Sequence, residues 1–203
     1  MNGSVGRLGV FGGAFDPPHA AHHALVEAAL AQLQLDALLI VPTGHAWHKE
    51  RPLSKAHDRI AMAELAFADL GRVRVDTRET LRNGPTYTVD TLRELHAENP
   101  NVTLFLVIGD DQARVLHRWR DWEAVVQLAI ICVAEREDPA GIAPRFTPPS
   151  GLEQRFLQLS FPVLSVSATD IRARVPAGLG IAPLVSEAVA RYIADHHLYQ
   201  SAR

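Results

Sequence analysis

Residues 9–22 of the chain read Gly9-Val10-Phe11-Gly12-Gly13-Ala14-Phe15-Asp16-Pro17-Pro18-His19-Ala20-Ala21-His22. The apolar residues 8–11 predict a short buried strand, and residues 20–33 carry apolar side chains at helical spacing. The run therefore predicts a strand, a glycine turn and a helix in succession. Two adjacent glycines let the main chain approach a ligand closely. The N-terminus of a helix attracts phosphate through its N–H groups and partial positive charge.

The two histidines of this run also favour a phosphate site. His19 and His22 are three residues apart, so on the first helical turn they share one face, where two imidazoles suit a polyphosphate. The alternatives are a glycine pair that only makes a tight turn, and histidines that are solvated or bind a metal. Zinc usually needs a third protein ligand, and no nearby Cys or Glu completes a familiar spacing. The run is neither a dinucleotide glycine motif nor a Walker loop.

Composition limits the classes of protein to which the chain can belong. With 203 residues, 47% of them hydrophobic, we expect one domain over residues 1–203 with a sizeable core. The 20 basic and 23 acidic residues give a net charge of -3, so we expect neither nucleic acid nor a membrane as partner. The chain shows no signal peptide and no apolar run of membrane-spanning length, which is typical of a cytoplasmic protein. A homo-oligomer remains open. Cys132 is the single cysteine, and its apolar surroundings predict a buried structural thiol.

Strands and helices alternate along the chain. Further strands are expected at residues 37–41, 73–75, 102–108, 128–134 and 163–166, and helices at residues 54–70, 89–98, 152–159 and within 167–203. Residues 135–150 are expected to form an irregular loop. This alternation predicts an α/β protein with three layers and a central parallel sheet.

Polar side chains follow several of the expected strands. His45, His48 and Lys49 lie in the loop after residues 37–41 and are candidates for an anionic group, with a solvated loop as the alternative. Gly109-Asp110-Asp111 follows residues 102–108, and its carboxylates could cap a helix or contact a ribose. Trp119 and Trp122 stand beside arginines. They could stack on a flat ring or anchor a short helix; we expect Trp122 in the core and leave Trp119 open.

A second candidate phosphate motif lies at Ser167-Ala168-Thr169-Asp170-Ile171-Arg172. Ser167 or Thr169 can cap the helix that begins here, and the hydroxyls and free N–H groups would form another anion site. Arg172 lies one turn further and carries a planar guanidinium suited to phosphate oxygens. The alternative is a capped surface helix with an exposed arginine.

These motifs resemble a known family. Residues 12–22 are similar to the G-G-x-F-D-P-x-H-x-G-H signature of nucleotidyltransferases with the His-x-Gly-His motif, and residues 167–172 resemble their S-x-T-x-I-R signature. Within that superfamily, the nicotinate mononucleotide adenylyltransferases are the group that the remaining motifs resemble: Pro85-Thr86-Tyr87-Thr88-Val89-Asp90-Thr91-Leu92, Gly109-Asp110-Asp111, Trp119 and residues 192–199. The matches run nearly end to end. They imply a Rossmann-like nucleotidyltransferase fold of three layers around a parallel sheet.

The resemblance implies a reaction and a set of site residues. The reaction joins ATP and nicotinate mononucleotide into nicotinate adenine dinucleotide and pyrophosphate, in NAD biosynthesis. Mg²⁺ would be held mainly by phosphate oxygens and water rather than by a protein metal site. The implied catalytic residues are His19, His22 and Arg172. The expected ATP contacts are Gly12, Gly13, Ala14, Phe15, His19, His22, Gly109, Asp111, Ser167, Thr169 and Arg172. The expected nicotinate mononucleotide contacts are Asp16, His45, Lys49, Thr86, Tyr87, Thr88, Trp119 and Arg120.

Three departures from the family pattern leave alternatives open. Ala21 stands where the family usually has Gly, Ala14 replaces the usual Thr, and Ala134-Glu135-Arg136 stands where the family often shows Arg-Arg or Arg-Pro. One alternative is a sister transferase that uses phosphopantetheine or nicotinamide mononucleotide, against which residues 86–92 and Trp119 argue. The other is a catalytically silent protein that binds ATP as a sensor.

Overall fold

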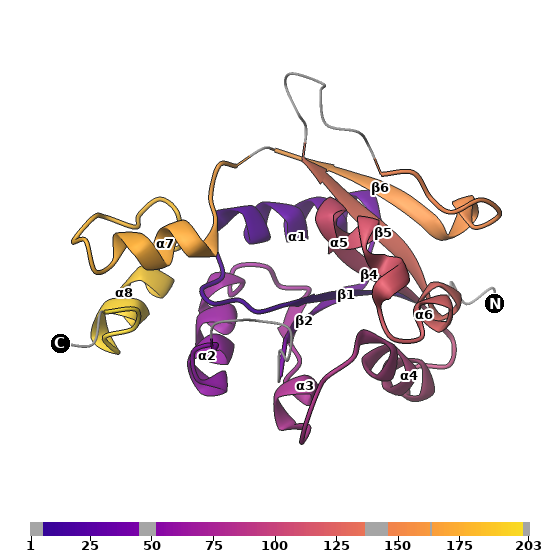
Figure 1. Ribbon diagram of the computed structural model, residues 1–203, viewed down its shortest axis with the longest axis horizontal. Helices are drawn as coiled ribbons and strands as arrows, with labels where there is room; N and C mark the ends of the chain where they lie inside the picture. The colour runs from indigo at the N-terminus through magenta and orange to yellow at the C-terminus, as the bar shows by residue number, and fades with distance from the viewer. Residues whose placement is uncertain (1–5, 45–51, 137–145, 163, 201–203) are drawn as a thin grey trace.

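The computed structural model describes residues 6–44, 52–136, 146–162 and 164–200. Six strands form one parallel sheet in the order β3-β2-β1-β4-β5-β6 (Figure 1). The strands are β1 (Gly6–Gly13), β2 (Ala37–Pro42), β3 (Val73–Val75), β4 (Val102–Gly109), β5 (Ala129–Arg136) and β6 (Phe156–Phe161). The predicted α/β fold with a central parallel sheet is confirmed.

Helices cover both faces of the sheet. Those longer than a single turn are α1 (Ala20–Gln32), α2 (Ala56–Ala66), α3 (Arg78–Leu81), α4 (Thr88–Glu98), α5 (Asp110–Arg114), α6 (Trp122–Leu128), α7 (Ala168–Arg174) and α8 (Glu187–Asp195). Buried side chains of α1, α2, α7 and α8 belong to one core, and those of α4, α5 and α6 belong to a second. Each core also contains residues from the strands, so the sheet is the middle of three layers.

Burial on both faces explains why the strands are continuous apolar runs. In β1, Phe11 belongs to the first core and Val10 to the second, and both are less than 10% exposed. The strand order changes direction between β1 and β4: β2 and β3 follow β1 on one side, and β4, β5 and β6 follow on the other. In open α/β sheets this point leaves a crevice beyond the carboxyl ends of the strands, where ligands bind. Gly13 ends β1 and Gly109 ends β4, so both lie at this crevice.

Two sequence-based predictions near the C-terminal third are wrong. The helix expected at residues 152–159 is a single 3-10 turn, η2 (Glu153–Arg155), followed by β6. No strand occurs at residues 164–166, within the region expected to hold the last strand. β6 forms instead because it pairs with β5, from Ile131 opposite Phe156 to Arg136 opposite Phe161. That pairing is with residues 25 positions away along the chain, and a short apolar run does not reveal it.

The helical C-terminal portion begins where the sequence predicts. Ser167 caps α7 by accepting a hydrogen bond from the N–H of Asp170 at 3.1 Å, and Ser186 caps α8 in the same way. Trp122, which was expected in the core, packs against the second core and is half-buried. Within the described residues, none of the helices has the length and apolar character needed to cross a membrane.

Candidate functional site

The glycine turn after β1 is held tightly by aromatic packing. Phe15 adopts a φ of 48°, a left-handed conformation that is uncommon for a bulky residue, and its side chain is 1% exposed. Its ring packs edge-on against Phe11, with ring centroids 5.5 Å apart, and against His22 at 5.3 Å. A Cβ on Gly13 would lie 3.1 Å from the same ring, so this position favours glycine. Strain of this kind persists only where the surroundings enforce it, and it is concentrated at functional sites.

The predicted histidine pair is assembled at the start of α1. The rings of His19 and His22 are stacked, with centroids 3.7 Å apart. The N–H of His19 donates to Nδ1 of His22 at 3.2 Å, so the neutral ring of His22 carries its proton on Nε2. The N-terminus of α1 is less open than expected, because the N–H of Ala20 donates to the carbonyl oxygen of Leu184 at 2.9 Å.

The second motif meets the first. Nη1 of Arg172 donates to the main-chain carbonyl oxygen of Asp16 at 2.8 Å, and Nη2 donates to Oγ1 of Thr169 at 3.1 Å. Thr169 thereby orients the guanidinium, while Ser167 serves as the helix cap. Two segments that the sequence separates by about 150 residues thus lie together beside the carboxyl end of β1.

The carboxylate of Asp16 is turned into the protein. It is 2% exposed, and it accepts hydrogen bonds from the hydroxyl of Tyr199 at 2.7 Å and from the N–H of Ser54 at 3.2 Å. The expected contact of Asp16 with the mononucleotide stays a prediction. Its side chain ties the glycine turn to the C-terminal segment and to the segment before α2, because a buried carboxylate must find donors inside the protein.

Two residues of this network were missed from the sequence. Arg59 of α2 is 2% exposed and donates to the carbonyl oxygens of Ala14 at 2.9 Å and Ser54 at 3.0 Å. Burial lowers the pKa of its guanidinium, and the nearby Asp16 partly opposes that shift. Tyr199 has a pKa raised by burial and by the charge of Asp16, so it remains a donor. The available signal was an arginine on the apolar side of an expected helix, together with a tyrosine in the closing motif.

The end of β4 provides the third predicted element of the site. Gly109 is the N-cap residue of α5, and the carboxylate of Asp111 lies close to it. Asp110 and Asp111 are the first residues of α5, and neither side chain makes a cap hydrogen bond, the first of the two alternatives considered for them. Asp110 pairs with Arg114 at 2.6 Å, whereas Asp111 is exposed.

Two of the residues expected at the mononucleotide are in contact with each other. The guanidinium of Arg120 lies 4.7 Å from the centroid of the Tyr87 ring, so the segment after η1 (Leu116–Arg118) meets the start of α4. Thr88 is the first residue of α4, and in the described part of the chain its N–H donates to no other group. Trp119 is half-buried against the second core. Oδ2 of Asp121 accepts from Nη2 of Arg93 at 3.2 Å. His45 and Lys49 lie outside the described residues.

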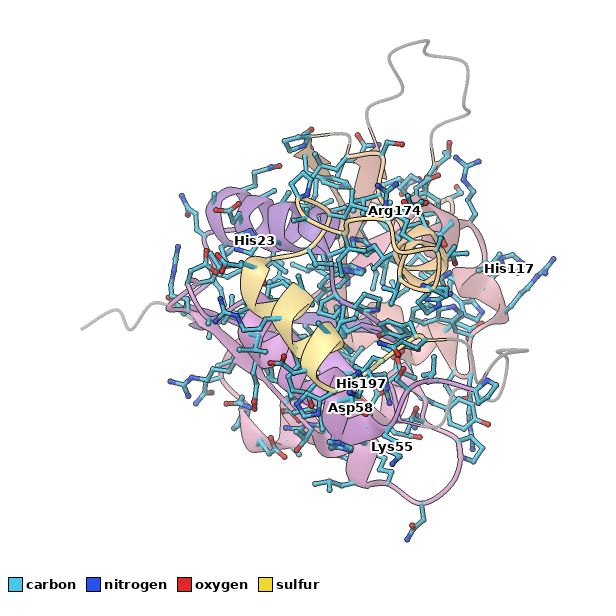
Figure 2. All side chains as sticks on the ribbon, turned by 90° about the vertical axis from the view of Figure 1, so that its left-hand side faces the viewer. His23, Lys55, Asp58, His117, Arg174 and His197 are labelled. Atoms are coloured by element: carbon cyan, nitrogen blue, oxygen red, sulfur yellow. The ribbon has the colours of Figure 1, made fainter. Side chains whose placement is uncertain are left out.

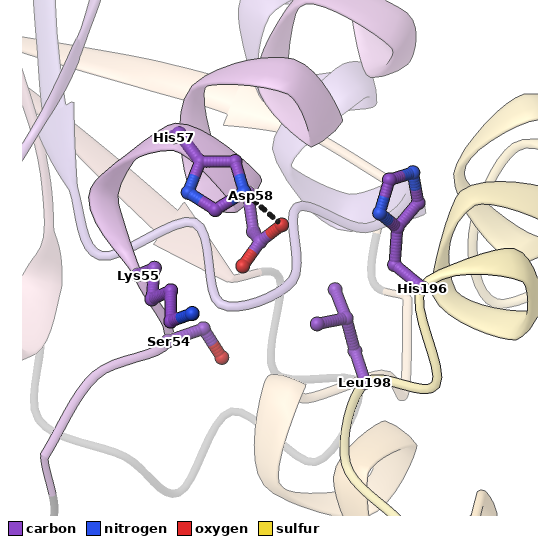
Figure 3. A pocket seen from close by; sticks show the side chains of 6 residues that line it. All are labelled: Ser54, Lys55, His57, Asp58, His196 and Leu198. Atoms are coloured by element: carbon purple, nitrogen blue, oxygen red, sulfur yellow. Dashed lines mark ion pairs between the residues drawn. The ribbon is translucent and has the colours of Figure 1, made fainter.

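A pocket opens between the start of α2 and the end of α8, next to the glycine-turn network through Ser54. Figure 2 views the molecule from the side of α7 and α8, and Figure 3 shows Lys55 and Asp58 across the pocket from His196 and Leu198. The pocket encloses about 320 Å³, and His57 pairs with Asp58 across 2.9 Å (Figure 3). Its lining residues are Ser54, Lys55, His57, Asp58, His196 and Leu198. No predicted site residue lines it, so this pocket is not the predicted nucleotide site.

Comparison with known proteins decides the family. The cytidylyltransferase-like family matches residues 10–174. A protein of Albidiferax ferrireducens named "Probable nicotinate-nucleotide adenylyltransferase" is 60% identical over 97% of this chain and 99% of its own length. The chain belongs to the nicotinate-nucleotide adenylyltransferase family. A second relative of that name, from Methylibium petroleiphilum, is 41% identical over 97% of this chain and 94% of its own length.

Solved structures of adenylyltransferases share this fold. The nicotinic acid mononucleotide adenylyltransferase of Plasmodium falciparum, complexed with NaAD, superposes with a TM-score of 0.76 at 18% identity, over 96% of this chain and 97% of that one. The predicted family and fold are therefore confirmed. Of the two unusual alanines, Ala21 packs its side chain against the first core, whereas Ala14 contributes only its main-chain carbonyl oxygen, which accepts from Arg59.

Proposed function

We propose that this chain transfers the adenylyl group of ATP to nicotinate mononucleotide, giving nicotinate adenine dinucleotide and pyrophosphate in NAD biosynthesis. The observation that carries the proposal is the meeting of the two phosphate motifs through the hydrogen bond from Arg172 to the carbonyl oxygen of Asp16. His19 and His22 begin a helix only a few residues after Asp16, at the crevice of a doubly wound sheet. Membership of the adenylyltransferase family supports the same activity.

The chemistry requires little beyond alignment and charge stabilisation. The acceptor phosphate is already ionised at neutral pH, so its oxygen attacks the α-phosphorus of ATP without a general base. The bond from that phosphorus to the β-phosphate oxygen breaks, and pyrophosphate leaves with the electron pair. His19, His22 and Arg172 are assigned to stabilising the negative charge on the phosphates, which is the usual means of catalysing phosphoryl-type transfer.

Mg²⁺ is expected to accompany ATP. The described residues contain no group of three or more His, Cys, Asp or Glu that could hold a metal ion. The carboxylate of Asp16 in the glycine turn is already used by Tyr199 and Ser54. This set of donors fits an ion that keeps several waters and is held by phosphate oxygens. When bound, the ion would neutralise charge on the polyphosphate.

The pyridine carboxylate of the acceptor would lie at the start of α4. The N–H groups of Thr88 and Val89 are at a helix N-terminus, which favours a negative group. Trp119 would stack on the pyridine ring. The nearby carboxylate of Asp121 is paired with Arg93, which reduces its repulsion of an acidic ring substituent. These features support the acid form of the mononucleotide over the amide form.

Pyrophosphate release tests the proposal. The protein is incubated with ATP and Mg²⁺, either alone or with nicotinate mononucleotide, nicotinamide mononucleotide or phosphopantetheine, and the adenylylated product is identified by mass. The proposal predicts release with nicotinate mononucleotide at the highest rate. Faster release with another acceptor would indicate a sister transferase, and ATP binding without release would indicate a sensor.

A further inference from the structure

A buried carboxylate lies beneath the expected mononucleotide subsite without belonging to it. Glu79 of α3 is 8% exposed, although glutamate is almost never buried unless it is paired. Its Oε1 accepts from the hydroxyl of Thr91 on α4 at 2.8 Å, and Thr91 is 1% exposed. Nη1 of Arg82 donates to the same hydroxyl at 2.9 Å. Burial raises the pKa of Glu79, while the Thr91 hydrogen bond and the charge of Arg82 oppose that shift.

The main chain at Glu79 is in direct contact with two neighbouring segments. A Cβ on Gly44, in the segment after β2, would clash with the carbonyl group of Glu79. The same Cβ would lie 2.9 Å from Cγ2 of Thr86. The main chain of Gly44 also favours the charged form of the Glu79 carboxylate. Gly44, Glu79 and Thr86 therefore form one tightly packed junction.

The junction joins the segments on which the mononucleotide subsite is expected. Gly44 leads into the loop after β2, and Thr86 immediately precedes Tyr87 and Thr88 at the start of α4. Thr91, one turn into α4, bonds to Glu79. Glu79 therefore links the start of α4 to the segment at Gly44. The hydrogen bonds of the Glu79 and Thr91 side chains run to α4 and Arg82 rather than to the glycine turn, whereas the segment at Gly44 is tied to that turn through its neighbour Thr43, whose N–H donates to the carbonyl oxygen of Gly13 at 2.8 Å.

We infer that Glu79 is a positioning residue for the acceptor mononucleotide: it fixes the start of α4 against the segment at Gly44 and thereby sets the affinity for the acceptor but not for ATP. This inference rests on the proposed function. It assigns Glu79 no contact with the substrate. Small misplacements of a substrate-positioning group are costly, since about 1 Å can cost about a hundredfold in rate.

The test compares three substitutions at the junction with two controls. Glu79→Ala removes the carboxylate, Glu79→Gln keeps its shape and an acceptor oxygen for Thr91, and Gly44→Ala adds the clashing methyl group. Gly71→Ala is the glycine control, because nothing lies within 4 Å of a Cβ at that position. Asp58→Asn is the control for a buried carboxylate, since Asp58 is 5% exposed and lies in α2. For each variant, KM for both substrates, kcat and thermal midpoint are measured.

The expected result is a difference between the two substrates. Gly44→Ala and Glu79→Ala should raise KM for nicotinate mononucleotide about tenfold or more while KM for ATP stays near wild type, and Glu79→Gln should recover most of that loss. The control variants Gly71→Ala and Asp58→Asn should keep the KM values for both substrates near wild type, whatever their thermal midpoints. If Glu79→Ala fails to fold, the KM values of Gly44→Ala for the two substrates test the inference.

Two results would overturn the inference. One is an equal rise in both KM values, and the other is an unchanged KM for the mononucleotide in folded Gly44→Ala and Glu79→Ala. Failure of the proposed function would be distinguished at once, because the wild-type protein would then not consume nicotinate mononucleotide at all.

Discussion

The guanidinium of Arg172 donates to the main-chain carbonyl oxygen of Asp16 at 2.8 Å, across 156 residues of sequence. The same aspartate accepts from Tyr199 through its carboxylate. The glycine turn is thus held from two directions by the C-terminal portion of the chain, α7 through Arg172 and the end of the chain through Tyr199. In Figure 1, α7 and α8 lie beside the start of α1, at the end of the sheet where β1 finishes. The C-terminal portion therefore lies against the proposed phosphate site.

Arg172→Lys is expected to reduce turnover strongly. A guanidinium can donate to Asp16, to Thr169 and to a phosphate oxygen in one fixed geometry, whereas an ammonium is a compact point charge on a flexible stem. Steady-state kinetics with varied ATP measures the effect. Arg174→Lys, in the same helix and bonded to the carbonyl oxygen of Gly180, is the matched control. Unchanged kinetics in Arg172→Lys would mean that this arginine is only structural.

His19→Ala and His22→Ala should each lower kcat by about 10²–10³, the usual loss when one charge-stabilising donor is removed. His23→Ala is the control on the same helix, because His23 faces away, with its ring stacked on Phe67 and its Nε2 3.1 Å from Asp69. The control should keep near wild-type turnover. Circular dichroism should show all three variants folded. Wild-type kcat in either of the first two would remove that histidine from the mechanism.

Tyr199→Phe should destabilise the protein by about 1–3 kcal/mol, because it leaves a buried carboxylate oxygen of Asp16 without its donor. Denaturant unfolding measures the loss. Tyr192→Phe is the control: Tyr192 donates to Asp58 at 3.0 Å, but Asp58 keeps His57 as a second partner at 2.9 Å. A loss in Tyr199→Phe no larger than in the control would show that the Asp16 link contributes little.

Cys132 should be inert in the folded protein. Its side chain is 0% exposed in β5, and burial raises the pKa of its thiol to about 12. At pH 8 only about one thiol in 10⁴ would then be the reactive thiolate. A chromogenic disulfide reagent should label it only after denaturation. Rapid labelling of the native protein at pH 8 would contradict this burial.

The sequence was sufficient to predict the sheet because its strands are continuous apolar runs separated by helices. Residues 8–11, 37–41 and 102–108 all lie within observed strands. The failure came at β6, where the strand is at the edge of the sheet and only part of it is buried: Phe156 and Leu159 face the core, while Leu157 is 39% exposed. A pattern this short does not distinguish helix from strand, so pairing with β5 decides.

For the site, motifs identified residues but not the direction of their side chains. The glycine turn, His19, His22 and Arg172 come together as predicted. Asp16 belongs to the same motif, yet its carboxylate points inward, because its partners Ser54 and Tyr199 come from distant segments. Arg59 and Glu79 were missed for the same reason, since a buried charged residue is recognised only from the partners that the fold brings to it. The roles given to the substrate-contacting residues stay predictions.

The preference of the enzyme for nicotinate over nicotinamide mononucleotide tests the account most directly. The values of kcat/KM for nicotinate and nicotinamide mononucleotide are measured under one condition, with Trp119→Ala beside the wild type. The N–H groups at Thr88 can donate to a carboxylate, whereas the NH₂ of an amide would face them as another donor. The account predicts a strong preference for the nicotinate form, and Trp119→Ala should weaken both substrates at a nearly constant ratio. Equal values, or a preference for the nicotinamide form, would contradict it.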